Sequence, residues 1–318
     1  MTKTTAMIAS YPNTGFITVR GDESVDFLQS ILTANVETLA VGDCRPGALL
    51  TPQGRILIDM MIYRPAPDSY ILRTDSARSD DLFNRLRRYR LRRPVVLARD
   101  PELRLALFFG SPTPADRAPG VDIYSDPRDP SLGAHLLFSD DATLTTFAAD
   151  HARGKIDGVE DALNNWHGRR IAAGVPEGPV DLTPERALML EAGLDRLGAV
   201  DFDKGCYIGQ EVTARTHYRG LIKRRLVPLM IDGAAPETGS VITFDGTEIG
   251  HSKTSAILNP SSAETDSDTA SALCLALLKL TDIHRIEKTN DKAGVLAVNG
   301  VPSRLVIPEW MRPLPEPK

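Results

Sequence analysis

The segment from Asp203 to Gly220 (DKGCYIGQEVTARTHYRG) gathers side chains that can carry chemistry. It holds a lysine, a thiol, a Gln–Glu pair, two arginines and a histidine. Gly205 and Gly209 permit tight turns and a close approach of a ligand to the backbone. The composition of the segment therefore predicts a reactive or ligand-binding site that includes Cys206.

Two interpretations of Cys206 follow from its neighbours. The residues from Tyr207 to Thr216 are predicted to form a helix with Cys206 near its N-terminus, where exposed N–H groups and Lys204 would favour thiolate over thiol. Such a thiolate is a nucleophile or a metal ligand. The alternative is a buried packing residue, which the local residues alone favour, because a lone cysteine usually behaves as a small hydrophobic side chain.

The cysteine and histidine counts limit the kinds of site that the chain can build alone. Cys44, Cys206 and Cys274 are odd in number and contain no C-x-x-C pair, and the six histidines are scattered. This pattern argues against a disulfide framework, a self-contained zinc site or a complete cluster site. Any bound cluster would be transient or shared with a partner.

Bulk composition predicts a cytoplasmic globular protein. The chain has 318 residues, with 37 Lys and Arg against 42 Asp and Glu, and a formal net charge of -5. This negative charge argues against a dedicated nucleic-acid-binding protein. The N-terminus lacks a signal-peptide pattern, and no apolar stretch reaches the roughly 18 residues that a membrane span needs. We expect no membrane association.

The elements that must position the motif are predicted to be α+β. Phe16 to Arg20 is a strand, followed by a turn at Gly21 and a helix capped by Asp22. Further elements complete this part: strands at 55–63, 69–74, 95–98 and 103–109, and a helix from Asp75 to before Pro94.

A second α+β unit and a β-rich end are predicted to follow. The second unit has strands near 121–124 and 134–138 and helices near 140–153 and 158–173. After Arg225, short apolar runs separated by glycines predict a small β-barrel or sandwich, with a polar loop at 259–271. The predicted domains are 1–110, 111–225 with the motif, and 226–318.

The run K-G-C-Y-I-G-Q-E followed by V-T-A-R resembles the signature of YgfZ-type folate-binding proteins, relatives of the glycine-cleavage aminomethyltransferase GcvT. The resemblance extends to FLQSILTANV (27–36), PQGRILIDMMIY (52–63), W-x-x-x-R-I-x-x-G-V-P from Trp166, and KRRLVPL (223–229). It implies a GcvT-like arrangement of ferredoxin-like or Greek-key α+β units and a C-terminal barrel around a central folate pocket. It also implies a role in maturing iron–sulfur (4Fe–4S) enzymes, with iron–sulfur client or assembly proteins as partners.

The resemblance assigns two residues outside the motif to tetrahydrofolate or a derivative. Glu191, within LMLEAG, matches the pterin-binding glutamate of GcvT-like proteins, and its two oxygens can accept from ring N–H groups. The alternative is a solvated helix glutamate. Trp166 matches a tryptophan associated with folate binding, but Val159, Leu163 and Trp166 share one helical face, so a core position is equally expected.

Asp59 bears on the choice between a transferase and a maturation factor. By strand alternation it lies among Leu57, Met61 and Tyr63, where a carboxylate needs a partner or a raised pKa. GcvT has adjacent acidic residues on this strand, one of them catalytic, and Ile58 aligns with that acid. The resemblance therefore implies a protein without aminomethyl transfer activity, in which Asp59 is a structural acceptor or a folate contact.

The predicted site thus has one candidate chemical residue, Cys206, and a set of candidate folate-binding residues: Asp59, Trp166, Glu191, Lys204, Gly205, Tyr207, Gln210, Glu211 and Arg215. Two alternative functions stay open, a tetrahydrofolate-dependent aminomethyltransferase or other one-carbon transferase, and folate-linked tRNA modification.

A basic helix adds a further hypothesis. Between Arg78 and Arg93 seven arginines flank the apolar face of Leu82, Leu86 and Tyr89. Such a face usually keeps a helix solvated. The sharper interpretation is that it docks an acidic partner or a polyglutamate folate tail.

Overall fold

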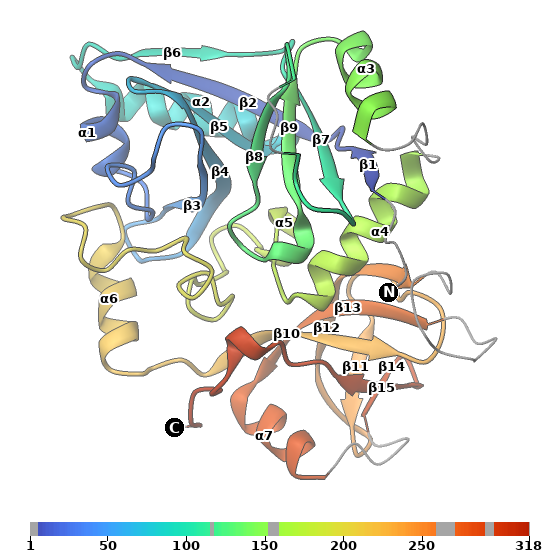
Figure 1. Ribbon diagram of the computed structural model, residues 1–318. Helices are drawn as coiled ribbons and strands as arrows, with labels where there is room; N and C mark the ends of the chain where they lie inside the picture. Colours follow the sequence, from blue (N-terminus) through green and yellow to red (C-terminus); the bar gives the residue numbers. More distant parts are fainter. Residues whose placement is uncertain (1–5, 115–117, 152–158, 259–270, 290–295, 318) are drawn as a thin grey trace. The chain divides into compact units, whose positions relative to one another are not determined.

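The computed structural model describes residues 6–114, 118–151, 159–258, 271–289 and 296–317 (Figure 1). The chain divides into two compact units. The first unit comprises Met1–Leu163 and Leu197–Gln210, and the second comprises Asn164–Arg196 and Glu211–Lys318. The KGCYIGQE motif therefore belongs to the first unit as far as Gln210, and Glu191 to the second. The division into three domains, 1–110, 111–225 and 226–318, stays a prediction.

A five-stranded antiparallel sheet forms the larger layer of the first unit. Its order is β3 (Cys44–Leu50), β4 (Ile56–Ala66), β5 (Ser69–Asp75), β2 (Thr14–Arg20) and β6 (Val96–Arg99). The predicted strands in this region are confirmed. β4 is apolar on both faces because both faces are covered, as the RILIDMMIY run indicated.

Two helices follow strands of this sheet. α2 (Ser76–Arg90) begins as predicted at Asp75, whose carboxylate accepts from the Ala77 N–H at 2.8 Å. α1 (Ser24–Gln29) differs from the prediction, because Glu23 rather than Asp22 precedes it and gives no side-chain cap. The capping role of Asp22 is therefore wrong. Ile31 and Leu32 lie beyond the end of the helix but are still buried.

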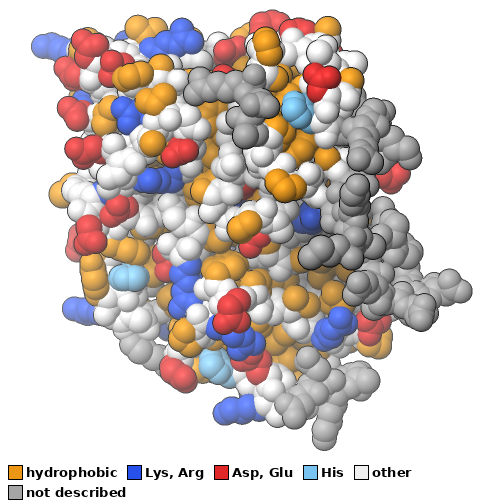
Figure 2. Space-filling view, in the orientation of Figure 1, with side chains coloured by type: hydrophobic (Ala, Val, Ile, Leu, Met, Phe, Trp, Pro, Cys, Tyr) orange, Lys and Arg blue, Asp and Glu red, His pale blue; other side chains and the backbone are white. Residues whose placement is uncertain are grey.

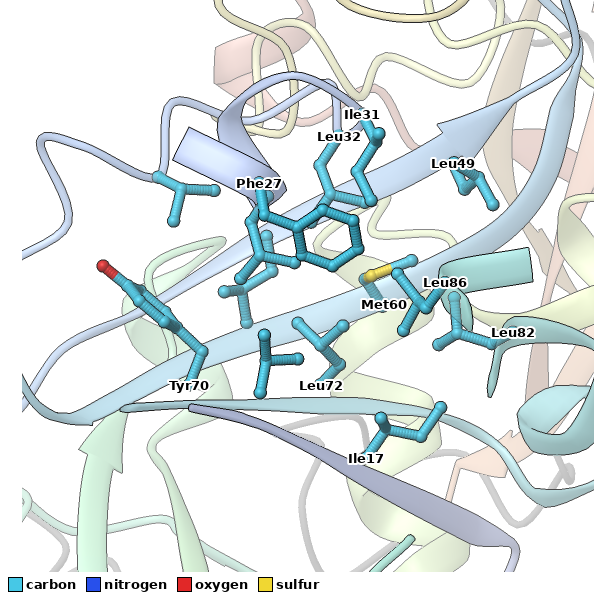
Figure 3. Close-up of a cluster of buried hydrophobic side chains, with 14 of the residues drawn as sticks. Ile17, Phe27, Ile31, Leu32, Leu49, Met60, Tyr70, Leu72, Leu82 and Leu86 are labelled. Atoms are coloured by element: carbon cyan, nitrogen blue, oxygen red, sulfur yellow. The ribbon is translucent and has the colours of Figure 1, made fainter. Parts of the chain in front are cut away.

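The core of this layer lies between the sheet and the helices. Figure 3 shows Phe27, Leu32, Met60, Leu72 and Leu86 pointing toward one another from α1, the turn after it, β4, β5 and α2. All five side chains are at most 5 % exposed. Burial of this apolar surface, worth about 25 cal/mol per Å², is the main driving force that fixes the layer.

A second antiparallel sheet completes the first unit. Its order is β1 (Met7–Ser10), β7 (Arg104–Phe109), β9 (Ala134–Phe138) and β8 (Asp122–Ser125). The 3₁₀ turn η1 (Pro130–Leu132) precedes β9, and α3 (Asp141–His151) packs Leu144 and Phe147 against this layer. The sheet takes strands from both sides of the predicted boundary near residue 110.

The second unit contains a closed antiparallel barrel, which confirms the predicted C-terminal barrel. The strand order is β10 (Arg224–Ile231), β13 (Ser271–Lys279), β12 (Thr247–Leu258), β11 (Val241–Phe244), β14 (Leu296–Val298) and β15 (Val301–Leu305). α7 (Leu280–Lys288) buries Leu280, Ile283 and Ile286 in its core. The predicted polar loop at 259–271 lies, apart from Ser271, outside the described residues.

Four further helical elements complete the described structure. α4 (Val159–Ala172) and α5 (Gly178–Asp181) precede the Glu191 turn, and α6 (Gln210–Tyr218) follows the motif. A 3₁₀ turn, η3 (Glu309–Met311), lies near the end of the chain. None of the described helices is long and apolar enough to cross a membrane. On the face that Figure 2 shows, basic and acidic side chains are interspersed.

Candidate functional site

The motif segment is tied to the turn that follows α1. Thr33 donates through Oγ1 to the Ala199 carbonyl at 2.6 Å, and the Asp201 N–H donates to the Thr33 carbonyl at 3.0 Å. The Asn35 amide donates to the Asp201 carboxylate at 2.9 Å. Three contacts across more than 160 residues of sequence therefore set where the motif begins.

Lys204 is the strongest of these anchors. Its side chain is 4 % exposed, and Nζ donates to the carbonyls of Leu32 and Ala34, each at 2.6 Å. Loss of hydration on burial lowers the pKa of Lys204 to about 8, against the opposing effect of Asp201. The ammonium is engaged by backbone carbonyls, so the expectation that it stabilises the Cys206 thiolate is not supported. Its role as a folate contact stays a prediction.

The thiol of Cys206 is exposed, whereas Cys44 and Cys274 are buried. Burial raises the pKa of both buried thiols, that of Cys274 to about 12. The packing interpretation of Cys206 is therefore wrong. So is its placement at a helix N-terminus, because α6 begins at Gln210 and a left-handed Gly209 (φ +83°) separates the helix from the thiol.

The glycines of the motif have different roles. A Cβ at Gly209 would lie 2.5 Å from the Thr51 carbonyl oxygen, so Gly209 is required where the motif passes the turn at 51–54. A Cβ at Gly205 would meet nothing within 4 Å. The close approach predicted for Gly209 is real, but its partner is the chain itself.

The residues beside Cys206 hold the loop from within. Tyr207 is 7 % exposed, with the Lys204 ammonium 5.3 Å from its ring centre, and Ile208 packs against the core. Burial raises the pKa of Tyr207 to about 12.

Asp59 is half-buried on β4 opposite Ala48, and its carbonyl accepts from Thr74.

In the second unit, Glu191 lies in a turn between buried apolar residues. Leu190 and Ala192 are at most 4 % exposed, whereas Glu191 is half-buried. The Glu191 carbonyl accepts from the Leu226 N–H at 2.8 Å. Glu191 is in a turn rather than a helix, so the interpretation as a solvated helix glutamate is wrong.

Arg225 fixes the same turn and was not identified from the sequence. Its guanidinium is 1 % exposed and donates through Nη1 to the Leu190 carbonyl at 2.6 Å. Nε and Nη2 have no hydrogen-bond partner among the described residues, and burial lowers the pKa of Arg225 to about 10. The available signal was an arginine that directly precedes the apolar run LVPLMI.

The C-terminal segment closes over this turn. The Trp310 ring lies 5.8 Å from the Arg225 guanidinium, and a Cβ at Gly193 would approach it to 2.8 Å. Trp310 donates to the Ala173 carbonyl at 2.7 Å, and Arg196 donates to the carbonyls of Met311 and Pro313. The Glu191 turn is therefore held by residues from β10, the end of α4 and η3.

The other predicted residues divide between the units. Trp166 is 1 % exposed in α4, which supports a core position rather than an open stacking face. Glu211 and Arg215 are exposed on α6, as is His217. Asp59, Lys204, Gly205, Cys206, Tyr207 and Gln210 lie in the first unit, and Trp166, Glu191, Glu211 and Arg215 lie in the second. A shared folate pocket stays a prediction.

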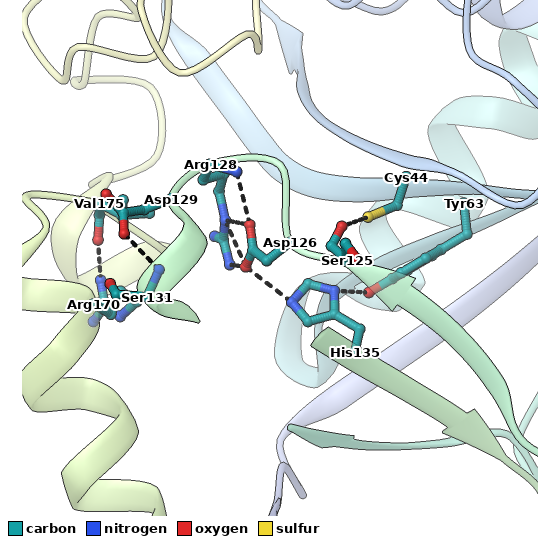
Figure 4. Close-up of polar contacts among 10 residues, drawn as sticks. All are labelled: Cys44, Tyr63, Ser125, Asp126, Arg128, Asp129, Ser131, His135, Arg170 and Val175. Atoms are coloured by element: carbon teal, nitrogen blue, oxygen red, sulfur yellow. Dashed lines mark hydrogen bonds and ion pairs between the residues drawn. The ribbon is translucent and has the colours of Figure 1, made fainter. Parts of the chain in front are cut away.

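A buried polar network joins the two sheets of the first unit (Figure 4). Tyr63 Oη lies 2.8 Å from His135 Nδ1, and His135 Nε2 lies 3.1 Å from the Asp126 carboxylate. Arg128 binds the same carboxylate at 2.7 Å and holds its pKa well below the usual range, with help from His135. Burial lowers the pKa of His135, so its imidazole is neutral. No sequence motif indicated this network.

No group of side chains suited to a metal ion occurs in the part of the chain that the structure describes. This leaves the exposed Cys206 as a single potential ligand or nucleophile. A lone thiol cannot by itself hold an iron–sulfur cluster.

Comparisons with known proteins match both ends of the chain. Residues 1–107 match the GCVT N-terminal domain, and residues 223–313 match the CAF17 C-terminal β-barrel domain. The fold is similar to that of the glycine cleavage system aminomethyltransferase T from Bartonella henselae, with a TM-score of 0.68, 16 % identity, and coverage of 96 % of this chain and 86 % of that one.

Similar curated proteins are named iron–sulfur cluster assembly factor IBA57, mitochondrial. The human protein is 34 % identical over 257 residues, which cover 73 % of this chain and 70 % of the relative. The mouse protein is 34 % identical, with 70 % and 66 % covered, and the Pyricularia oryzae homologue is 30 % identical, with 76 % and 64 % covered. The chain thus spans about two thirds of the length of these relatives.

These relatives correct one prediction and settle the family. They are mitochondrial by name, which contradicts the predicted cytoplasmic location. The human alignment, together with the GcvT-type N-terminal domain and the CAF17-type barrel, agrees with the YgfZ-like signature. The chain belongs to the IBA57 family of iron–sulfur cluster assembly factors, which is related to the GcvT aminomethyltransferases.

Proposed function

We propose that this chain is a folate-binding accessory factor in the assembly or repair of 4Fe–4S proteins, and that Cys206 is required for this function. The observation that carries the proposal is an exposed thiol on a loop whose backbone is held by buried contacts. A fixed loop presents the sulfur to a partner at little cost in conformational entropy.

Cys206 acts with the cluster as cargo. A thiolate is a suitable iron ligand, and one ligand from this chain leaves the remaining iron positions to a client or assembly protein. Such shared ligation suits transfer better than storage, because the cluster leaves when the partner supplies the missing ligands. Iron–sulfur client or assembly proteins are therefore the proposed partners.

The Glu191 turn fits a pterin. Glu191 is a half-buried carboxylate between buried apolar residues, and a carboxylate can accept from the N–H groups of a pterin ring. The buried Arg225 guanidinium, with two nitrogen atoms lacking partners among the described residues, adds unsatisfied donors next to the turn. Tetrahydrofolate would supply a reduced, one-carbon-carrying pterin, and Glu191 would orient it.

Folate binding is tested by titration calorimetry with tetrahydrofolate. We expect Glu191→Gln to weaken binding about tenfold or more, because the amide loses one acceptor of the bidentate pair. Glu185→Gln is the matched control, since Glu185 is exposed in the same stretch of chain. Equal affinity of wild type and Glu191→Gln would remove Glu191 from the site.

The maturation function is tested in cells that lack the protein. We expect low activity of a labile 4Fe–4S enzyme, normal levels of its polypeptide, and recovery of activity when the chain is restored. Normal enzyme activity in the deletion would refute the proposed function, whatever the folate titration shows.

An aminomethyltransferase is the second candidate, because the whole-chain fold is similar to that of a known aminomethyltransferase. The strand that carries the acidic pair of GcvT has Ile58 beside Asp59, and Ile58 is 2 % exposed in the core. We expect no lipoyl-protein-dependent aminomethyl transfer by the purified protein. Clear turnover would replace the maturation proposal with this one.

A further inference from the structure

At β6, one edge of the five-stranded sheet has no neighbouring strand among the described residues. This strand is the last in the order and the outermost one in Figure 1, and β2 is the one described strand with which it pairs. The Asp100 N–H donates to the Phe16 carbonyl. Because the backbone groups of successive residues alternate in direction along a strand, the N–H and C=O groups of Ala98 and Val96 point toward β2. The N–H and C=O groups of Leu97 and Arg99 therefore point away from the sheet, and no described residue bonds them.

Several arginines beside this edge have no acidic partner. At the start of α2, Asp81 binds Arg78 and Arg85, and Asp80 binds Arg99. Arg90 donates to the Val95 carbonyl. Four further guanidinium groups form no ion pair with the described residues: Arg87, Arg88, Arg92 and Arg93. Figure 2 shows Lys or Arg side chains, together with Asp or Glu side chains, along the upper margin, where β6 lies in Figure 1.

Apolar side chains are exposed at the same place. Leu91 is 79 % exposed and Val96 is 64 % exposed. A shallow hollow of about 700 Å³ lies at this turn, and it is lined by Glu23, Leu91, Arg92, Arg93 and Pro94. Leu91 also has a left-handed backbone (φ 52°), which is strained for a leucine.

Local contacts hold this strained turn in place. Arg90 donates to the Val95 carbonyl at 3.3 Å, and the Arg93 N–H donates to the Arg90 carbonyl at 3.0 Å. A Cβ at Gly21 would lie 2.5 Å from the Pro94 carbonyl, so the turn rests directly on backbone. The structure thus maintains an exposed leucine between α2 and β6 instead of burying it.

Two simpler explanations account for only part of this surface. Basic residues near a helix C-terminus favour the helix dipole, and a charged, short edge strand resists aggregation. Neither explains an exposed Leu91 and Val96, which would promote aggregation. Pairing of β6 with β6 of a second copy is also disfavoured, because the same unpaired arginines would face one another.

We propose that this surface binds an extended acidic segment of a partner protein, which adds to the sheet as a strand beside β6. We call it the basic edge: β6, Leu91, and Arg87, Arg88, Arg92 and Arg93. Leu97 and Arg99 supply the main-chain hydrogen bonds, the arginines meet carboxylates, and Leu91 and Val96 contact apolar side chains. The proposal does not depend on folate or on Cys206.

The test uses a labelled ten-residue peptide of alternating Thr and Glu with the full chain, followed by fluorescence anisotropy. We expect saturable binding that the double variant Arg88→Glu, Arg92→Glu weakens about tenfold or more. The control is Arg104→Glu, Arg304→Glu, which changes the net charge equally at exposed arginines already beside Asp141 and Asp232. Thermal unfolding establishes that each variant is folded.

A second probe separates strand addition from attraction between charges. The same peptide with N-methyl groups on its five central residues keeps every carboxylate but cannot donate main-chain hydrogen bonds. We expect it to bind about tenfold or more weakly. Equal binding of the two peptides, equal weakening by both double variants, or no binding at all would overturn the proposal.

Competition decides between acidic ligands. Poly-γ-glutamate and a single-stranded oligonucleotide of equal charge should displace the peptide poorly, because neither can pair as a β-strand. Displacement by either at a lower concentration than the unlabelled peptide would assign the basic edge to that ligand instead. Loss of peptide binding through self-association of the chain would assign it to a second copy.

Discussion

The motif loop around Cys206 and the turn around Glu191 are held by the same device, a buried cation that donates to backbone carbonyls. In the first, the Lys204 ammonium donates to two carbonyls and lies 5.3 Å from the centre of the Tyr207 ring. In the second, Arg225 fills one acceptor and keeps two nitrogen atoms without partners among the described residues. The difference suggests that the second cation has the greater capacity to donate to a ligand.

The strongest way to break the motif loop is Gly209→Ala. The new Cβ would meet the Thr51 carbonyl oxygen, a backbone atom that cannot turn aside, at a positive φ. We expect the free energy of unfolding to fall by about 3 kcal/mol in denaturant titration. Gly205→Ala, where a Cβ meets nothing within 4 Å, should cost about 1 kcal/mol, and equal losses would show that the contact with Thr51 is unimportant.

Replacing Lys204 and Arg225 in turn compares how much each buried cation contributes to the stability of the fold. Lys204→Met leaves two buried carbonyls without donors and should cost about 2 to 3 kcal/mol in the free energy of unfolding. Arg225→Met should cost about 1 kcal/mol or less, because it removes a buried charge whose nitrogens are only partly satisfied.

The two variants should rank in the opposite order when tetrahydrofolate affinity is measured instead of stability. We expect Arg225→Met to weaken binding several-fold, by loosening the Glu191 turn and removing donors that have no partner among the described residues, and a folded Lys204→Met to weaken binding less. If Arg225→Met is the more destabilising variant and binds folate as wild type does, then Arg225 is only a structural residue.

A fall in pH should lower the free energy of unfolding of the first unit, which contains Lys204. The folded-state pKa of His135 lies below its ordinary 6.5, so below about pH 6.5 the unfolded chain binds more protons and stability falls. The pKa of Asp126 is also lowered, which adds a further loss as the pH falls below its ordinary 3.8. Each group contributes a slope of at most about 1.4 kcal/mol per pH unit.

Denaturant titrations between pH 5 and 7 measure the first of these losses. His135→Gln should be less stable at pH 7 but should show a flatter pH dependence over this range. An unchanged slope would mean that the imidazole of His135 is not the acid-sensitive group.

The smallest expected effect is that of Cys206→Ser on stability. The thiol is exposed and belongs to no described hydrogen bond, so the change should stay within about 0.5 kcal/mol in denaturant titration. A large loss of stability would contradict the placement of Cys206 on the surface.

The sequence predicted those parts of the fold that depend on local patterns. Periodic apolar residues and the cap at Asp75 identified α2, and short apolar runs between glycines identified the barrel strands. Asp22 is not the cap of α1, because the helix begins two residues later, at Ser24. Which residue caps a helix depends on the backbone conformation at its first turn, and the residue types do not fix that conformation. The motif helix was placed too early for the same reason, since Gly209 adopts a left-handed conformation.

The contacts that hold the site could not be predicted, because they join distant parts of the chain. Lys204 was singled out for its nearness to Cys206, yet its partners lie 170 residues away or more. Arg225 and Trp310 are far from Glu191 in sequence but hold its turn. Local spacing identifies which side chains are chemically interesting, whereas their partners are set by the tertiary fold.

The most direct test of the account is the activity of a labile 4Fe–4S enzyme in cells that lack this protein, rescued in parallel by wild type, Cys206→Ser and Cys274→Ala at matched levels of folded protein. The account predicts rescue by wild type and by Cys274→Ala, whose thiol is buried in the barrel, and no rescue by Cys206→Ser. Full rescue by Cys206→Ser would contradict the proposed role of the exposed thiol.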